Sequence, residues 1–122
     1  MKQLFTVKGR LPGYNELRQH HMVAARVKRL AMETVGWAAK AQKIEPVTGP
    51  VTIKITCYEP NARRDPDNVT SGAAKCILDA LQNIGVLKND NRKHVKPILP
   101  PPKIDKEDPR VEIFIQDMEE DQ

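Results

Sequence analysis

The sequence predicts a single α+β domain, in which a small mixed or antiparallel sheet of about four strands packs against two helices. Three observations predict this class. Alternating, β-branched runs occupy residues 51–58 and 110–116, and two segments with helical spacing of apolar residues lie before and between them. Because 122 residues is the size of one domain, we expect a single domain over residues 1–122 with the element order β-α-β-α-β-β.

The first two elements are a short strand and a long helix. Residues 1–7 contain an alternating stretch that runs into a loop with two glycines and a proline. Asn15 can cap the helix that follows. From residue 16 to about residue 43, side chains recur at steps of three and four, which predicts an amphipathic helix. This stripe comprises Val23, Val27, Leu30, Thr34, Trp37 and Ala41, and the other face carries Arg26, Arg29, Glu33, Lys40 and Lys43.

The central strand and the second helix follow. Residues 51–58 place four apolar side chains on one face of a strand. A second amphipathic helix runs from near Asp67 to Ile84, and Gly85 occupies the position where helices commonly end. Its buried stripe is predicted to contain Val69, Ala73, Cys76, Ile77, Ala80, Leu81 and Ile84.

Two more strands complete the domain. Residues 93–99 and 110–116 read as a final strand pair, and the proline-rich, charged residues 100–109 read as the loop between them. Residues 118–122 are expected to form a mobile tail.

Charge is divided unevenly along the chain. The net charge of +4 conceals a body, residues 1–104, with 18 basic and 8 acidic residues, and a C-terminal segment with 2 basic and 8 acidic ones. A body with net charge +10 favours a polyanionic partner such as nucleic acid or a lipid headgroup surface. Only 5 side chains are aromatic, which argues against a base-stacking platform.

Several other classes of protein are disfavoured by the sequence. No run of about 18 apolar residues and no signal-peptide core occur, so we expect a cytoplasmic protein without a membrane partner. Cys57 and Cys76 lack metal-ligand spacing and are expected to be small core residues. A calcium-binding loop is excluded because the residues after Asp65 lack the third acidic ligand, the turn glycine and the final glutamate.

Two aspartates concentrate the chemistry between the central strand and the second helix. Asp65 and Asp67 flank Pro66, which fixes the backbone and can direct both carboxylates toward one point. Convergent carboxylates together with substrate phosphate oxygens make a sufficient site for a hard divalent ion such as Mg²⁺. The alternative is that either aspartate only caps the helix and complements its dipole.

The exposed face of the second helix carries a lysine and a further carboxylate. Helical spacing places Asn68, Ser71, Lys75, Asp79 and Gln82 in one arc opposite the apolar stripe. Lys75 and Asp79 could therefore serve the same site as the two aspartates. They are also an ordinary pair, four residues apart, that stabilises a helix by about 0.2–0.5 kcal/mol, and both interpretations stay open.

Three segments of the chain together resemble a known family. They are Arg63-Arg64-Asp65-Pro66-Asp67-Asn68, Lys75-Cys76-Ile77-Leu78-Asp79-Ala80-Leu81 and Gly85-Val86-Leu87-Lys88-Asn89-Asp90. They resemble the RusA family of Holliday junction resolvases, small Mg²⁺-dependent endonucleases often carried by prophages. The resemblance implies that Asp65, Asp67 and Asp90 are catalytic metal ligands and that Lys75 is the catalytic lysine. Asp79 matches a position that is usually acidic, which makes it a further candidate ligand.

The resemblance also implies a cofactor, a mechanism and partners. Mg²⁺, for which Mn²⁺ could substitute, would activate water for phosphodiester hydrolysis, and Lys75 would offset charge in the transition state. The substrate would be branched DNA, namely the four-way junction, and the protein would act as a homodimer. The phosphates of the DNA would be neutralised by cations of the first helix and of the segments around the aspartates. These are Arg26, Arg29, Arg63, Arg64, Lys88, Arg92 and Lys93.

The spacing of the lysine departs from the family. Many members place it four residues after the second aspartate, whereas Asp67 and Lys75 are eight residues apart. In a helix continuous from Asp67, the additional residues carry Lys75 about 6 Å further along the axis. If residues 70–72 instead form a loop, with Ser71 capping a later helix start, Lys75 keeps the family position. We favour the loop.

Two other functions are compatible with these residues. A nuclease of the same chemistry could cut another branched DNA, such as a replication fork or a flap. A non-catalytic DNA-binding module could use the acidic residues only as caps and ion-pair partners. Symmetric cleavage of a four-way junction separates a resolvase from the first alternative, and metal binding at the aspartates separates it from the second.

Overall fold

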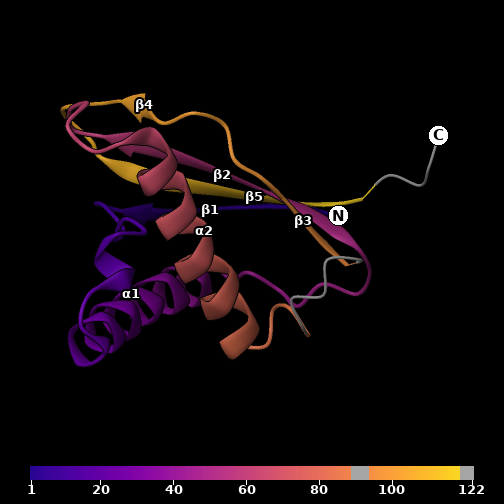
Figure 1. The fold of residues 1–122 in the computed structure, drawn as a ribbon. Coiled ribbons are helices and arrows are strands. Elements are labelled where there is room, and N and C mark those ends of the chain that lie inside the picture. The colour runs from indigo at the N-terminus through magenta and orange to yellow at the C-terminus, as the bar shows by residue number, and fades with distance from the viewer. Residues whose placement is uncertain (89–93, 119–122) are drawn as a thin grey trace.

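Two helices cover one face of a five-stranded sheet (Figure 1). The computed structural model describes residues 1–88 and 94–118. It confirms the α+β class, with one strand more than the sequence predicted. The elements in chain order are β1 (Lys2–Lys8), the 3-10 turn η1 (Glu16–Arg18), α1 (His21–Ala41), β2 (Val51–Glu59), α2 (Pro66–Asn83), β3 (Val95–Ile98), β4 (Lys103–Ile104) and β5 (Arg110–Asp117).

The sheet has the strand order β1-β5-β2-β3, and β4 pairs with the C-terminal end of β2. β5 is antiparallel to both β1 and β2, whereas β3 and β4 run parallel to β2. The predicted final strand pair is therefore wrong in one respect, because β2 lies between β3 and β5. The predicted loop 100–109 also contains a strand, since Lys103 pairs with Tyr58 and Ile104 with Glu59.

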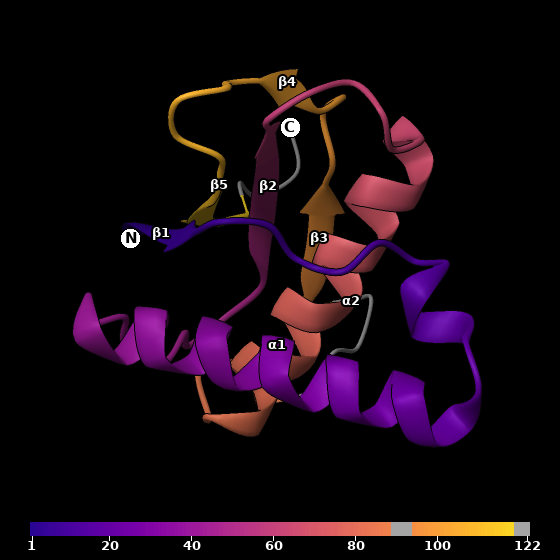
Figure 2. The ribbon, with the colours of Figure 1, turned by 90° about the vertical axis from the view of Figure 1, so that its left-hand side faces the viewer.

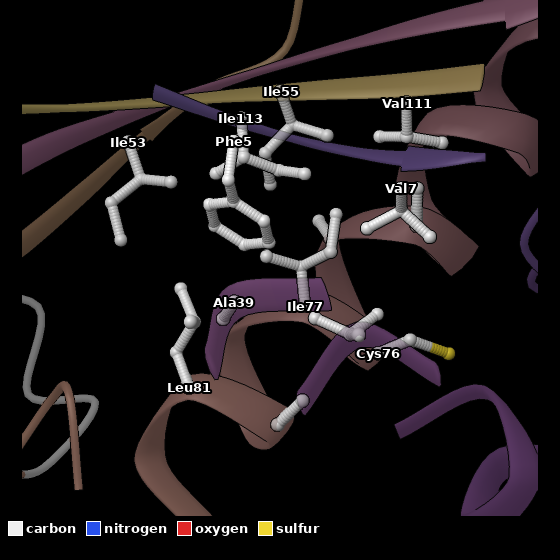
Figure 3. Packing of buried hydrophobic residues seen from close by; sticks show 14 of the residues in the cluster. Phe5, Val7, Ala39, Ile53, Ile55, Cys76, Ile77, Leu81, Val111 and Ile113 are labelled. Atoms are coloured by element: carbon white, nitrogen blue, oxygen red, sulfur yellow. The ribbon is translucent and has the colours of Figure 1, made fainter. Parts of the chain in front are cut away.

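The core lies between the sheet and the helices (Figure 3). The apolar inward-facing residues of β2 and β5 are at most 2% exposed, which confirms the alternation seen in the sequence. Cys57 and Cys76 belong to this core, as expected, and burial raises the pKa of each thiol to about 11. The residues that line it include Val51, Ile53, Ile55, Val111, Ile113 and Ile115 from the sheet and Val69, Ala73, Ile77, Ala80 and Leu81 from α2.

The start of α1 differs from the prediction. The residues expected to form its first turn are the separate turn η1, and the extended backbone of Gln19 separates that turn from α1. The helix then begins at His21. Its cap is His20, whose Nδ1 accepts a hydrogen bond from the N–H of Met22 at 3.4 Å. Asn15, the predicted cap, has helical dihedral angles and makes no capping hydrogen bond with its side chain.

The apolar stripe predicted on α1 does not face the core. Val23, Leu30 and Trp37 are 46%, 51% and 73% exposed. The residues that α1 buries are instead Ala31, Val35, Gly36 and Ala39. At Gly36 a Cβ would lie 3.3 Å from Ile84 Cγ2, so the small residue allows close packing against the end of α2. α1 therefore packs on α2 and β1 mainly through small side chains, while Leu30 and Trp37 stay outside. Figure 2 shows α1 lying beside α2.

The acidic C-terminal segment is partly held against the body. The Arg110 guanidinium donates hydrogen bonds to Asp105 at 2.8 Å and to Glu112 at 2.9 Å. It also stacks on the Tyr58 ring, 3.8 Å from the centroid. Of the predicted mobile tail, residue 118 is held by its N–H, which donates to the carbonyl of Pro50 at 2.9 Å. Residues 119–122 lie outside the described residues.

Candidate active site

Asp65 and Asp67 lie at the N-terminal end of α2, where the helix dipole is positive. Asp65 is the N-cap, and its Oδ2 accepts a hydrogen bond from the N–H of Asn68 at 3.1 Å. Pro66 is the first residue of the helix. Proline is tolerated there because the N–H of the first helical residue makes no hydrogen bond within the helix. Asp67 follows in the first turn, and both carboxylates are exposed. The capping interpretation is therefore correct for one oxygen of Asp65, while both side chains still face solvent.

The loop after β1 is attached to the first two turns of α2. Asn68 joins the two segments, because its Oδ1 accepts a hydrogen bond from the N–H of Asn15 at 2.6 Å and its carbonyl accepts one from the N–H of Tyr14 at 2.9 Å. One turn later, Gly72 contacts this loop so closely that a Cβ there would overlap the carbonyl oxygen of Pro12. The loop thus lies beside the aspartates and fixes the position of the helix that carries them.

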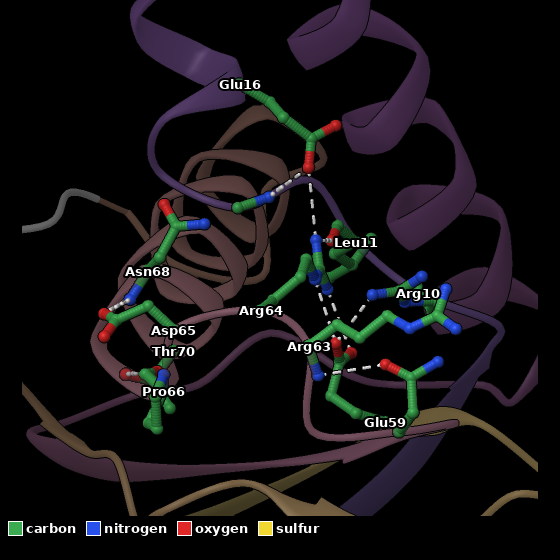
Figure 4. A network of polar contacts seen from close by, with 12 residues as sticks. Arg10, Leu11, Glu16, Glu59, Arg63, Arg64, Asp65, Pro66, Asn68 and Thr70 are labelled. Atoms are coloured by element: carbon green, nitrogen blue, oxygen red, sulfur yellow. Dashed lines mark hydrogen bonds and ion pairs between the residues drawn. The ribbon is translucent and has the colours of Figure 1, made fainter.

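Arg64 connects the end of β2 to the start of α2 (Figure 4). Its Nε and Nη2 each donate to one carboxylate oxygen of Glu59, both at 2.9 Å. Its Nη1 donates to the carbonyl of Leu11 at 3.0 Å and to Glu16 at 3.2 Å. Arg10 donates a further hydrogen bond to Glu59 at 2.9 Å. We call these five residues the Arg64 clamp, and the clamp ends on the residue immediately before Asp65.

The clamp is built around a buried charge. The Glu59 side chain is 5% exposed, and this burial acts to raise its pKa. The hydrogen bonds from Arg64 and Arg10 outweigh the burial and hold the pKa below its usual range. Arg64 is itself 18% exposed, and burial acts to lower its pKa, but the bonds to Glu59 outweigh it and the pKa is raised. Both groups therefore stay charged at neutral pH.

The position of Glu59 in the sequence indicates a buried ion pair, although Glu59 belongs to none of the motifs described above. Glu59 follows Cys57 by two residues and therefore lies on the same buried face of β2. A carboxylate on the buried face of a strand needs a cationic partner, because an unpaired buried charge is strongly unfavourable. The partner could not be identified from the sequence, since Arg10 and Arg64 approach Glu59 from different segments.

Lys75 does not keep the family position. α2 is continuous over Pro66–Asn83, so the prediction of a loop at residues 70–72 is wrong. Gly72 is part of the helix because its lack of a side chain lets the helix pack closely against the loop after β1. Lys75 therefore lies about 12 Å along the axis from Asp67. Its Nζ is 3.7 Å from Asp79.

Asp79 links the two helices. Its Oδ2 lies 2.5 Å from Nζ of Lys28 on α1, and its side chain is 22% exposed. This contact and the Lys75 pair account for its charge without a metal ion. The ion-pair interpretation of Lys75 and Asp79 is thus supported by the contacts, and it places both residues away from the N-terminal end of α2.

The predicted DNA-binding cations are spread over the surface. Arg63 is exposed two residues before Asp65, and Lys88 is exposed after α2. Arg26 and Arg29 are exposed on α1, where Arg29 borders a hollow of about 590 Å³ at the C-terminal end of α2, at the opposite end of the helix from Asp65. Asp90, Arg92 and Lys93 lie outside the described residues.

The chemistry of the carboxylates fits a hard divalent cation. Within residues 1–88 and 94–118, no three acidic, histidine or cysteine side chains gather as a metal site. Asp65 and Asp67 supply two exposed carboxylates on one helical turn, and Mg²⁺ is commonly held by one or two carboxylates together with water and substrate phosphates. The pair is thus sufficient in ligand type, and the predicted third ligand, Asp90, follows α2 in the chain.

Comparison with known proteins identifies a family. A family model described as Endodeoxyribonuclease RusA matches residues 8–116. No curated protein matches the chain.

In the described part of the chain, none of the helices has the length and apolar character required to span a membrane.

Proposed function

Because this chain belongs to the RusA endodeoxyribonuclease family, whose members resolve Holliday junctions, we propose that it cleaves four-way DNA junctions by metal-dependent phosphodiester hydrolysis. Family membership makes it a nuclease that acts on branched DNA. The observation that carries the metal-dependent mechanism is the first turn of α2, where Asp65 and Asp67 face solvent.

The two aspartates, with Asp90, would hold Mg²⁺ or Mn²⁺. When bound, such an ion polarises the scissile phosphodiester and lowers the pKa of a bound water. The task of the protein is to hold the oxygen ligands in place before the substrate arrives. The hydrogen bond from Asn68 orients Asp65, and the Arg64 clamp fixes the backbone on which both aspartates stand.

Phosphate contacts would come from the cations around the turn. Arg63 is exposed two residues before Asp65 and would neutralise a phosphate next to the scissile one. Lys75 is about two turns further along α2, so it would contact a neighbouring phosphate instead of the scissile one. Junction choice would then rest on backbone shape and charge. Paired cleavage of a junction requires two active sites, which a homodimer would supply.

Removal of one carboxylate tests the proposal. In Asp67→Asn, and equally in Asp65→Asn, we expect Mg²⁺-dependent cleavage of a synthetic four-way junction to fall at least about 100-fold, because a metal ligand is lost. Asparagine still caps a helix, so folding should be preserved. Junction binding, measured by gel shift without metal, should persist. The matched control is Asp117→Asn, at the end of β5, which should cleave as wild type.

Three results would contradict the proposal. Wild-type cleavage by either Asp65→Asn or Asp67→Asn would remove the catalytic assignment. Cleavage of forks or flaps in preference to four-way junctions would favour the alternative nuclease. Absence of cleavage with both Mg²⁺ and Mn²⁺, together with absence of Mn²⁺ from the aspartates in soaked crystals, would favour a DNA-binding module.

A further inference from the structure

The hollow at the C-terminal end of α2 is not used by the proposed nuclease site. It has a volume of about 590 Å³ and lies between α1 and the last residues of α2. We call it the α1–α2 hollow. Asp65 lies at the other end of α2, about 27 Å away along the helix axis. A ligand in the hollow would therefore leave the aspartates accessible to DNA.

The hollow has an apolar wall. Four residues form it, from both helices: Met32, Gly36, Trp37 and Ile84. Met32 and Ile84 are partly buried against the core, whereas the Trp37 side chain is 73% exposed. Gly36 has no side chain to fill the space in front of Ile84. Since tryptophan is enriched among the residues that dominate binding energy at interfaces, an exposed indole beside such a recess indicates a place for an apolar side chain of a partner.

Cations lie toward both ends of this wall. Arg29 and Lys40 line the hollow and are exposed, and neither forms an ion pair in the described part of the chain. They are eleven residues apart on α1, which corresponds to about 16 Å along the helix axis. Glu33 lies between them, and Lys28 is already paired with Asp79 at 2.5 Å. The hollow thus offers positive charge at two separated points and apolar surface between them.

We propose that the α1–α2 hollow binds a short acidic segment of a partner protein, in which one apolar side chain lies between two carboxylates. An extended chain rises about 3.3 Å per residue, so about five residues span the distance between Arg29 and Lys40. The central apolar side chain packs on Trp37 and Ile84. The outer carboxylates pair with the two cations and fix the register of the segment.

A DNA backbone matches this arrangement less well. It carries a negative charge at every phosphate, so it would bring charge next to Glu33 as well as to the two cations. It would also leave the apolar wall beside Trp37 without a partner. The surroundings of Arg29 therefore favour a peptide over the DNA contact that the sequence predicted for this residue.

This inference goes beyond the proposed function, because it adds a protein partner at a surface remote from the aspartates. Peptide binding can be measured without DNA or metal. Its failure is therefore distinct from failure of the nuclease proposal.

Binding of a synthetic peptide to the full chain tests the proposal. The probe is Asp-Ser-Phe-Ser-Asp with blocked ends and a fluorescein label, and binding is followed by fluorescence anisotropy. We expect a dissociation constant below about 1 mM. Two control peptides, with asparagine in place of both aspartates or alanine in place of phenylalanine, should bind at least about 10-fold more weakly. Absence of binding, or equal binding of all three peptides, would overturn the proposal.

Variants of the hollow locate the binding. Trp37→Ala should raise the dissociation constant of the probe at least about 10-fold, and Arg29→Glu and Lys40→Glu should each raise it at least about 5-fold. The matched controls are Leu4→Ala, 62% exposed on β1, and Lys106→Glu, exposed in the C-terminal segment, which should bind as wild type. Wild-type affinity in Trp37→Ala would show that the probe binds elsewhere and would overturn the proposal.

The emission of Trp37 distinguishes the peptide from other occupants. Trp37 is the sole tryptophan, so its emission should shift to shorter wavelength when the unlabelled probe covers the indole. A shift caused by a four-way junction but not by the probe would assign the hollow to DNA. A shift caused only by raising the concentration of the protein itself would assign it to a second copy. Either result would overturn the proposal.

Discussion

Arg63 and Arg64 are adjacent and chemically identical, yet their surroundings differ. Arg64 donates to Glu59, Glu16 and the backbone of Leu11, and its guanidinium is directed into the protein. Arg63 is exposed, and its described hydrogen bond is made by its backbone N–H to Asn61 at 3.0 Å. The pair that the motif presents as one basic unit therefore divides into a structural residue and a surface cation.

Substitution of Arg64 should lower the stability of the protein, whereas substitution of Arg63 should weaken DNA binding. Arg64→Ala should lower the free energy of unfolding by about 3 kcal/mol, because it leaves the buried Glu59 with Arg10 alone. Arg63→Ala should change that free energy by less than about 0.5 kcal/mol. It should instead weaken junction binding and reduce the slope of log affinity against log salt by about one.

Urea unfolding and salt titrations of both variants check this contrast. Equal stabilities of Arg63→Ala and Arg64→Ala would contradict the structural role of Arg64. An unchanged salt slope in Arg63→Ala would contradict its role as a phosphate contact.

At the scale of elements, the contact between α2 and the loop after β1 decides where the active-site turn lies. Asn68 supplies the hydrogen bonds and Gly72 supplies the space. The loop crosses the helix at this point, which is why a glycine occurs inside α2 although glycine disfavours helices by about 1 kcal/mol relative to alanine.

Gly72→Ala tests this contact. A helix normally gains stability from alanine, but here the added Cβ would overlap the backbone of Pro12 and Gly13. We expect a net loss of about 1–3 kcal/mol in the free energy of unfolding. Amide hydrogen exchange should also become faster at Tyr14 and Asn15, whose N–H groups are bonded to Asn68. The neighbouring exposed Ser71→Ala serves as control, and a stabilising Gly72→Ala would contradict the close approach.

At the scale of the whole molecule, several acidic residues form ion pairs with arginines and lysines that the charge distribution along the sequence does not reveal. Among the acidic residues of the C-terminal segment, Asp105 and Glu112 hold Arg110, and the Arg110 hydrogen bond keeps the pKa of Asp105 below its usual range. In the body, Glu59 and Asp79 are each engaged by two cations. The carboxylates of Asp65 and Asp67 differ from these, because they stand exposed at the start of α2.

The stability of the whole fold should fall in acid, and Glu59 should account for part of the decrease. Its pKa is lower in the folded protein than in the unfolded chain, so its contribution is complete above the unfolded value of about 4.3 and is lost as pH falls through the folded value. Glu59→Gln should be about 1–3 kcal/mol less stable than wild type at pH 7. Its stability should depend less steeply on pH between about 5 and 3.

Urea unfolding at a series of pH values measures this dependence. Glu45→Gln, which removes an exposed carboxylate, is the matched control and should follow wild type. Parallel curves for wild type and Glu59→Gln would show that Glu59 is not an ion-paired carboxylate in the folded state.

The sequence by itself determined the α+β class, the inward faces of β2, β5 and α2, and the placement of Asp65 and Asp67 at the start of a helix. These features could be predicted because each depends on neighbours within a few residues: alternation for a strand, helical spacing for α2, and a proline after a capping aspartate. The first of the three segments that resemble the family, residues 63–68, lies at this helix start.

The tertiary structure alone decided which face of α1 is buried, that α2 continues through Gly72, that β2 separates β3 from β5, and that Arg64 is held inside while Arg63 is exposed. Each of these depends on a contact between segments far apart in the chain. α1 shows the reason most clearly. Its apolar spacing is regular, yet the helix packs through Ala31, Val35 and Ala39, because α2 and β1 lie close to that side and leave room for small side chains.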